Sequence, residues 1–243
     1  MTKYPTAVDV VKSVLGQMGL PVPVAVVGSV GDATATQMLY LLQWIGRKLV
    51  KAQPHRWATL MKTFELLTIP ATTLYDLPVD WDSFEDLTGW NFTSRLPMLG
   101  PATDPQWQCL KARNLGSSTI SVIYRVRGRQ LEIYNAFSST QSLKIDYTSR
   151  SWVYNPGSLS YAEQITADDD ELLYDRELLI AALRLEFLQA KGFDTTAAQA
   201  EYNRALESAI CADAESPILT VNINDTYPLI TTQFNAPDTG YGA

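Results

Sequence analysis

The chain has few of the residues on which enzymes and secreted proteins depend. Its 243 residues include only two cysteines and one histidine. Cys109 and Cys211 lie far apart and form no CxxC pair, so free thiols in a reducing compartment are the expectation. His55 stands close to Trp57, and no nucleophile motif such as GxSxG accompanies it. We therefore interpret His55 as a structural residue.

Long apolar runs and the common cofactor motifs are missing as well. The longest apolar run, Leu20 to Val30, is interrupted by two prolines, a glycine and a serine, and it is too short to span a membrane. Residues 1–5 lack the continuous apolar segment of a signal peptide. The sequence contains no HExxH, no Cys/His cluster and no Walker-type phosphate loop, so it predicts neither a metal nor a cofactor.

Positive charge is scarce in the last third of the chain. The net charge of −7 divides into +3 over residues 1–55, +1 over 56–160 and −11 over 161–243. Binding to nucleic acid needs a basic patch that displaces counterions from the phosphates, and this charge distribution argues against a nucleic-acid-binding function. A solvated acidic face is the simplest interpretation. Head-to-tail contact between opposite surfaces of neighbouring copies is the alternative.

Two blocks of the chain, residues 6–51 and 171–212, carry apolar residues at helical spacing. Thr6 followed by Asp9 resembles a capping box, and Asp32 is placed to cap a second helix. Each block has one apolar stripe, which needs a partner to bury it. We therefore expect the two blocks to pack together, although about 120 residues separate them.

A run of acids, Asp168 to Glu171, opens the second block. Such a run could bind a cation, but it lacks the alternating ligands and the glycine of a calcium loop. Acids at a helix start are also stabilised by free amide groups and by the helix dipole. The sequence therefore predicts a helix start here and no metal.

Between the helical blocks the pattern changes to that of strands. Residues 64–69, 72–78, 119–126 and 129–134 form short apolar runs bounded by turn residues. Arg127 and Gly128 separate the last two runs and predict a tight hairpin turn. Residues 143–148 alternate between apolar and polar side chains.

These patterns predict an α+β protein with an insertion. Residues 1–55 and 161–213 are expected to form a helical bundle domain, and residues 56–160 an inserted antiparallel β-sandwich or barrel. Residues 214–243 remain as an extended C-terminal arm.

Two alternatives to a structural role depend on the strand region. Asp80, Asp82, Glu85 and Asp86 surround Trp81, and a glycan-degrading enzyme would need two of them in one cleft. A carbohydrate-binding or receptor-binding tail module would instead expose several of the six tryptophans on one face. Burial of Trp81, Trp90 and Trp107 would count against both.

Three segments resemble the head-to-tail adaptor proteins of short-tailed phages, the group that includes tail tubular protein A and gatekeeper-like connectors. The segments are residues 10–19, residues 56–60 leading to 74–81, and residues 166–171 running to 191–194. The likeness covers about residues 6–212 in order and spacing, and its motifs are structural.

The resemblance implies a virion structural protein that assembles into a ring, a dodecamer in this family. The ring would join the portal protein to the tail nozzle protein at the head–tail interface. It would also line the channel through which DNA passes without specific binding. No catalytic residue, cofactor or membrane contact comes with the family, so the chain is not expected to be an enzyme.

The last segment has the composition of an assembly arm. After Pro217, β-branched and polar residues alternate, although the segment follows a predicted helix and has no evident strand partner. A strand with unpaired backbone groups is stabilised by joining another sheet. The resemblance makes the portal or a neighbouring subunit the acceptor. The expected contact residues are Ile218, Val221, Ile223, Tyr227, Leu229, Ile230 and Phe234.

Overall fold

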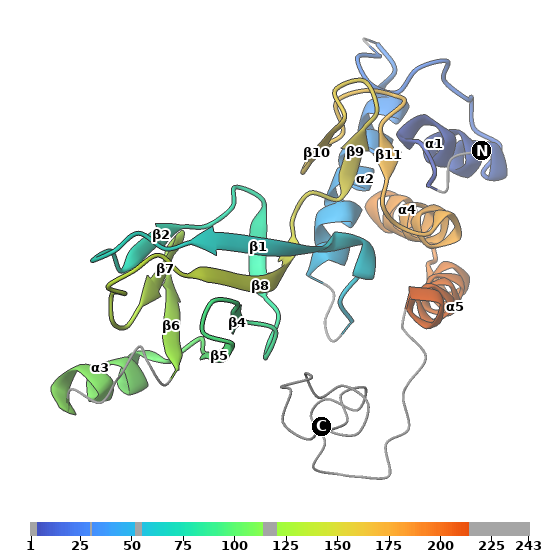
Figure 1. Ribbon diagram of the computed structural model, residues 1–243. Helices are drawn as coiled ribbons and strands as arrows, with labels where there is room; N and C mark the ends of the chain where they lie inside the picture. The colour runs from blue at the N-terminus through green and yellow to red at the C-terminus, as the bar shows by residue number, and fades with distance from the viewer. Residues whose placement is uncertain (1–3, 30, 52–54, 114–120, 214–243) are drawn as a thin grey trace, which may run out of the picture.

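A computed structural model describes residues 4–29, 31–51, 55–113 and 121–213 (Figure 1). Within these ranges the chain forms five α-helices, one short 3-10 helix and eleven strands. The protein therefore belongs to the mixed α+β class, as the sequence predicts. None of the helices in these ranges is long and apolar enough to cross a membrane.

Helices from both ends of the chain share one apolar core. The first block supplies α1 (Ala7–Gln17) and α2 (Ala33–Val50), and the second supplies α4 (Arg176–Lys191) and α5 (Thr196–Asp213). Helix α4 contacts each of the other three, which agrees with the expectation that the two blocks pack together. Its side chains are buried around much of its circumference, as in a helix enclosed by neighbours. The shared core includes Val10, Val14, Met38, Leu42, Leu179, Leu183 and Phe187.

The helix caps follow from local residues. The Thr6 hydroxyl accepts a hydrogen bond from the backbone N–H of Asp9, and the Asp32 carboxylate accepts from two N–H groups in the first turn of α2. Asp175 caps α4 in the same way, and Gly192 ends it in the left-handed conformation. Both caps predicted in the first block are confirmed.

The second helical block begins later than predicted, at Arg176 instead of residue 171. Leu172 pairs with Val153 in a small sheet, so the acidic run leads into a strand and not into a helix. This antiparallel sheet has the order β10 (Ser160–Ala162), β9 (Val153–Asn155), β11 (Glu171–Leu172). Trp152 and Val153 belong to the core of the helices, although they fall within the predicted insert.

A separate eight-stranded mixed sheet curls into a half-barrel around its own apolar cluster. The strand order is β1-β8-β4-β5-β6-β7-β2, and β3 also pairs with β8. The elements are β1 (Met61–Leu67), β2 (Leu74–Asp76), β3 (Trp81–Phe84), β4 (Trp90–Asn91), β5 (Leu96–Leu99), β6 (Val122–Arg127), β7 (Gln130–Ile133) and β8 (Ser142–Ser149).

One strand pair departs from the antiparallel arrangement that the sequence predicts. Strands β5 and β6 are parallel. Parallel neighbours require a crossover connection, usually a helix, and here the crossover includes α3 (Asp104–Arg113). The sequence pattern did not indicate α3, because its only buried side chain is Trp107. The predicted hairpin between β6 and β7 is present, with its turn one residue later, at Gly128 and Arg129.

The sheet is attached to the helices through two neighbouring segments. The short 3-10 helix η1 (Ala58–Leu60) leads into β1, and β8 leads back towards Trp152. Strands β1 and β8 are antiparallel partners from Met61 opposite Thr148 to Leu67 opposite Ser142. Figure 1 shows them extending together away from the helices. How the chain divides into independently folding units, including the boundaries 56–160, stays a prediction.

Candidate interaction surfaces

The predicted arm residues, Ile218 to Phe234, lie outside the described residues, but the point where their segment begins is defined. Helix α5 ends at Asp213, whose Oδ2 accepts a hydrogen bond of 2.9 Å from the backbone N–H of Ala58. The same oxygen lies 2.9 Å from Nε2 of His55. The His55 ring packs edge-on against Trp57, which is buried in the helical core. The end of α5 is therefore held beside the entry to the sheet.

This geometry agrees with the structural role inferred for His55. Its imidazole connects the end of α5 to the segment that precedes η1, across 158 positions of sequence. The contact joins a residue from each side of the insertion. Sequence reasoning could not find it, because nothing near either residue indicates the other.

The carboxylates around Trp81 have separate partners. Asp80 accepts hydrogen bonds from Lys62 Nζ at 2.7 Å, Ser149 Oγ at 2.7 Å and Tyr147 Oη at 3.0 Å. Burial alone would raise the pKa of Asp80, but these bonds, led by the one from Lys62, hold it below its ordinary value. Because its three donors come from β1 and β8, an anionic Asp80 is suited to joining these strands to the turn that precedes β3.

Glu85 is held elsewhere. Arg56 Nε lies 3.2 Å from Glu85 Oε2, an ion pair whose angles do not meet those of a hydrogen bond. Two of the four acids thus each face a cation, and the pKa of Asp80 is lowered, whereas a general acid at neutral pH needs a raised one. Asp80 and Glu85 therefore have different partners, and the choice between a structural cluster and a glycosidase pair stays a prediction.

The acidic run before α4 accepts hydrogen bonds mainly from backbone N–H groups. Asp168 Oδ1 accepts from the N–H groups of Val26 and Val27 at 3.0 and 2.8 Å. Asp170 is fully buried, and its Oδ2 accepts from the N–H groups of Thr166 and Ala167. Within the described part of the chain, no group of three His, Cys, Asp or Glu residues is arranged to hold a metal ion.

The tryptophans do not form a common exposed platform. Trp57, Trp107 and Trp152 are buried, while Trp81 and Trp90 are half-buried in the sheet. Trp107 contributes to packing: the Arg125 guanidinium lies 4.5 Å from its ring centre, and Arg125 in turn pairs with Glu132 at 2.6 Å. Of Trp81, Trp90 and Trp107, whose burial would count against both alternatives, only Trp107 is buried, so the criterion is met in part.

The remaining tryptophan, Trp44, marks a surface that the sequence interpretation missed. It lies on α2 with 58% of its surface exposed, one turn after Tyr40, which is 69% exposed. Trp44 falls outside the apolar stripe of α2, and this position in the sequence could have indicated that its side chain is exposed. We define the α2 stripe by its exposed side chains, which follow one another at helical spacing: Thr36, Tyr40, Trp44, Arg47, Lys48 and Lys51.

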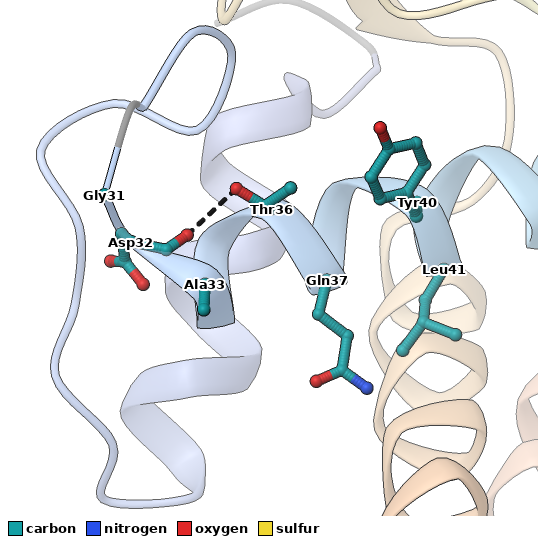
Figure 2. A pocket seen from close by; sticks show the side chains of 7 residues that line it. All are labelled: Gly31, Asp32, Ala33, Thr36, Gln37, Tyr40 and Leu41. Atoms are coloured by element: carbon teal, nitrogen blue, oxygen red, sulfur yellow. Dashed lines mark hydrogen bonds between the residues drawn. The ribbon is translucent and has the colours of Figure 1, made fainter.

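Two open hollows lie along the α2 stripe. The first, of about 540 Å³, is lined from Gly31 to Leu41, and Figure 2 shows Tyr40 standing out from the helix at its edge. The second, of about 530 Å³, lies at the other end, between Trp44, Lys51 and Tyr202 of α5. Exposed aromatic and arginine side chains beside such hollows are typical of protein interfaces.

Comparison with protein-family models gave no match to the chain, and comparison with curated proteins gave none either. Its function is therefore inferred from its own residues and their geometry.

Proposed function

We propose that the chain is a virion structural protein, a ring-forming head-to-tail adaptor that joins the portal protein of a phage to its tail. In this proposal the helices form a bundle, the sheet is an inserted domain, and residues 214–243 are the arm that binds the portal or a neighbouring subunit. The protein would act at the head–tail interface of the virion, and DNA would pass through the ring without specific binding.

The observation that carries the proposal is the position of Asp213. Its carboxylate is bound to Ala58 N–H and faces His55, so the C-terminal segment begins at a fixed point of the folded body. The 30 residues that follow contain three acids and no lysine or arginine. An apolar segment of this kind suits addition as a strand to the sheet of a partner, and Asp213 places the end of α5 from which it would extend.

Further support comes from the chemistry of the polar clusters. Asp80 and Glu85 each face a cation, and His55 faces Asp213. These groups connect segments that are distant in sequence, which suits a protein whose work is to hold its shape within an assembly. The resemblance of residues 6–212 to phage adaptors adds the portal and the tail nozzle as partners.

The proposal is tested by measuring binding to the portal protein of the same virion. The full chain and a chain truncated after Ala214 are each mixed with portal, and the masses of the complexes are determined. We expect the full chain to form a ring on the portal. The truncated chain should retain the circular dichroism spectrum of the folded body but fail to bind.

A matched pair of variants distinguishes the effect of the arm's anchor side chains on portal binding from the effect of the arm's length. Replacement of Tyr227, Leu229 and Ile230 by alanine removes the expected anchors, whereas replacement of Asn222, Asn224 and Thr226 by alanine leaves them. We expect the first variant to lose portal binding and the second to keep it. A truncated chain that still takes its place on the portal would overturn the assembly-arm proposal.

A further inference from the structure

The α2 stripe has the composition of an interface centre, and no element within the described ranges covers it. Trp44 and Tyr40 expose more than half of their surface, although large exposed aromatic side chains are more costly to hydrate than polar ones. Tryptophan, tyrosine and arginine are the residues that most often dominate binding energy at protein interfaces. The stripe combines all three on one helix.

The cations of the stripe are available to a partner. Lys48 pairs with Glu186 at 2.9 Å, but Arg47 and Lys51 make no ion pair within the described part of the chain. All three lie in the last turns of α2, where the negative end of the helix dipole stabilises them in the unbound protein. A partner for this end of the stripe should therefore carry negative charge.

The same chain carries a surface of the opposite charge. Residues 163–177, which we call the acidic segment, contain seven acids and one arginine. Asp168, Asp170 and Asp175 are used to bind backbone N–H groups, as described above. Glu163, Asp169 and Glu177 remain exposed to solvent. Glu177 lies 3.9 Å from Arg176 of the same segment, and this ion pair is exposed to solvent. The segment therefore presents exposed carboxylates at Glu163, Asp169 and Glu177 on a body that is well ordered by hydrogen bonds.

We propose that the α2 stripe of one copy binds the acidic segment of a second copy. The inference rests on the ring proposed above, because it names the contact between subunits that such a ring needs. Two different surfaces meet, so the contact is heterologous, and its repetition extends an assembly from copy to copy. Trp44 and Tyr40 supply the apolar centre, while Arg47 and Lys51 fix the orientation.

Charge reversal on each side provides the test. The variant Arg47→Glu/Lys51→Glu reverses the charge of the α2 stripe, and the variant Asp169→Lys/Glu177→Lys reverses that of the acidic segment. Sedimentation equilibrium of the full chain without portal, from micromolar to millimolar concentration at low salt, measures self-association. We expect each variant to weaken self-association by about tenfold or more, and Trp44→Ala to weaken it by about thirtyfold.

Mixing the two variants distinguishes a direct contact from a general effect of charge. Each variant retains the surface that the other has lost, and the two reversed surfaces attract each other, so an equimolar mixture should associate where neither variant does so alone. A chain that carries all four substitutions should regain self-association. The control Arg127→Glu/Arg129→Glu makes the same change at the exposed turn of the sheet and should have no effect. Circular dichroism confirms that every variant is folded.

The inference is overturned if the unsubstituted chain stays monomeric at every concentration, or if the mixed variants form no dimer. Portal binding is measured separately. A chain that self-associates through this contact but ignores the portal would contradict the adaptor function and leave the contact standing. A chain that binds the portal without responding to the charge reversals would contradict the contact alone.

Discussion

The helical core and the eight-stranded sheet are stabilised in different ways. The core of the helices is almost entirely apolar, and its residues come from both ends of the chain. The sheet contains most of the buried polar groups, namely Thr68, Asn91, Arg125, Thr148 and Ser149. Apolar burial is non-directional and tolerates distant sequence partners, whereas buried polar groups require defined geometry. We therefore infer that the helical core supplies most of the stability, whereas the polar groups of the sheet fix the geometry of its strands.

The largest effect should follow from a cavity in the helical core. Leu183 of α4 is fully buried, and Leu183→Ala should lower the free energy of unfolding by about 2–5 kcal/mol. Leu131→Ala makes the same cavity in the sheet, where Leu131 is equally enclosed. Hydrogen exchange should show faster opening of α1, α2 and α4 in the first variant and of β2, β6 and β7 in the second. Faster exchange over the whole chain in both would show that the two cores unfold as one unit.

A smaller loss is expected when the ion pair that anchors α3 is removed. Arg125 is buried between Glu132, at 2.6 Å, and the ring of Trp107. Arg125→Met keeps the apolar stem but leaves Glu132 with only the more distant cation of Lys111, at 3.8 Å, which should cost about 1–3 kcal/mol. Exchange of the α3 amides should rise, while the helical core is unchanged. Arg127→Met, on the exposed end of the same strand, should change the stability by less than about 0.5 kcal/mol.

Two glycines test how tightly the helices pack. A Cβ at Gly46 would overlap the ring of Trp152, and the Gly46 carbonyl accepts a hydrogen bond of 3.1 Å from Tyr174 Oη. Gly46→Ala should therefore destabilise the chain by about 1–3 kcal/mol, despite the better helix propensity of alanine. Gly16 of α1 has open space around it, so Gly16→Ala should stabilise by up to about 1 kcal/mol. Thermal unfolding of both variants measures the difference, and equal shifts would contradict the close contact at Trp152.

The smallest effect concerns pH. Burial opposes ionisation of Asp80, but the bonds from Lys62, Ser149 and Tyr147 outweigh it, so the pKa of Asp80 is lower in the folded chain. Its contribution to stability is therefore complete above the ordinary value of 3.8 and is lost as the pH falls below it. Urea unfolding between about pH 5 and pH 2 should show a shallower acid loss for Asp80→Asn than for the unsubstituted chain. Asp76→Asn, on an exposed strand, serves as the control. An unchanged slope in Asp80→Asn would contradict the role of this carboxylate.

The sequence predicted those features that depend on neighbouring residues. The caps at Thr6 and Asp32 and the alternating strand Ser142–Ser149 each follow from a few adjacent side chains. Helix α3 was missed because Trp107 is its single buried side chain, which leaves no apolar periodicity to detect. The strand at Glu171 was missed because its partner, Tyr154, forms part of a sheet that the sequence pattern did not separate from the insert.

The candidate surfaces were harder to predict than the fold. The contact of His55 with Asp213 and the bonds of Asp80 join residues that are far apart in the sequence, and no local pattern encodes them. The exposure of Trp44 was in principle detectable, because residue 44 lies off the apolar stripe of α2. The sequence analysis weighed the tryptophans as a group, and the position of Trp44 on the helix was not used.

The pairing of β1 with β8 gives the molecule a modular topology. Met61 and Thr148 are directly opposite each other, so the helical core meets the sheet as a loop whose ends are already joined. The entropy of closing a loop grows only with the logarithm of its length, and exchange of this loop for a two-residue turn changes that term by about 3 kcal/mol. Insertions of very different size are therefore compatible with the same helices. If the sheet is an inserted module, as proposed, evolution could enlarge or replace it without rebuilding the helical core.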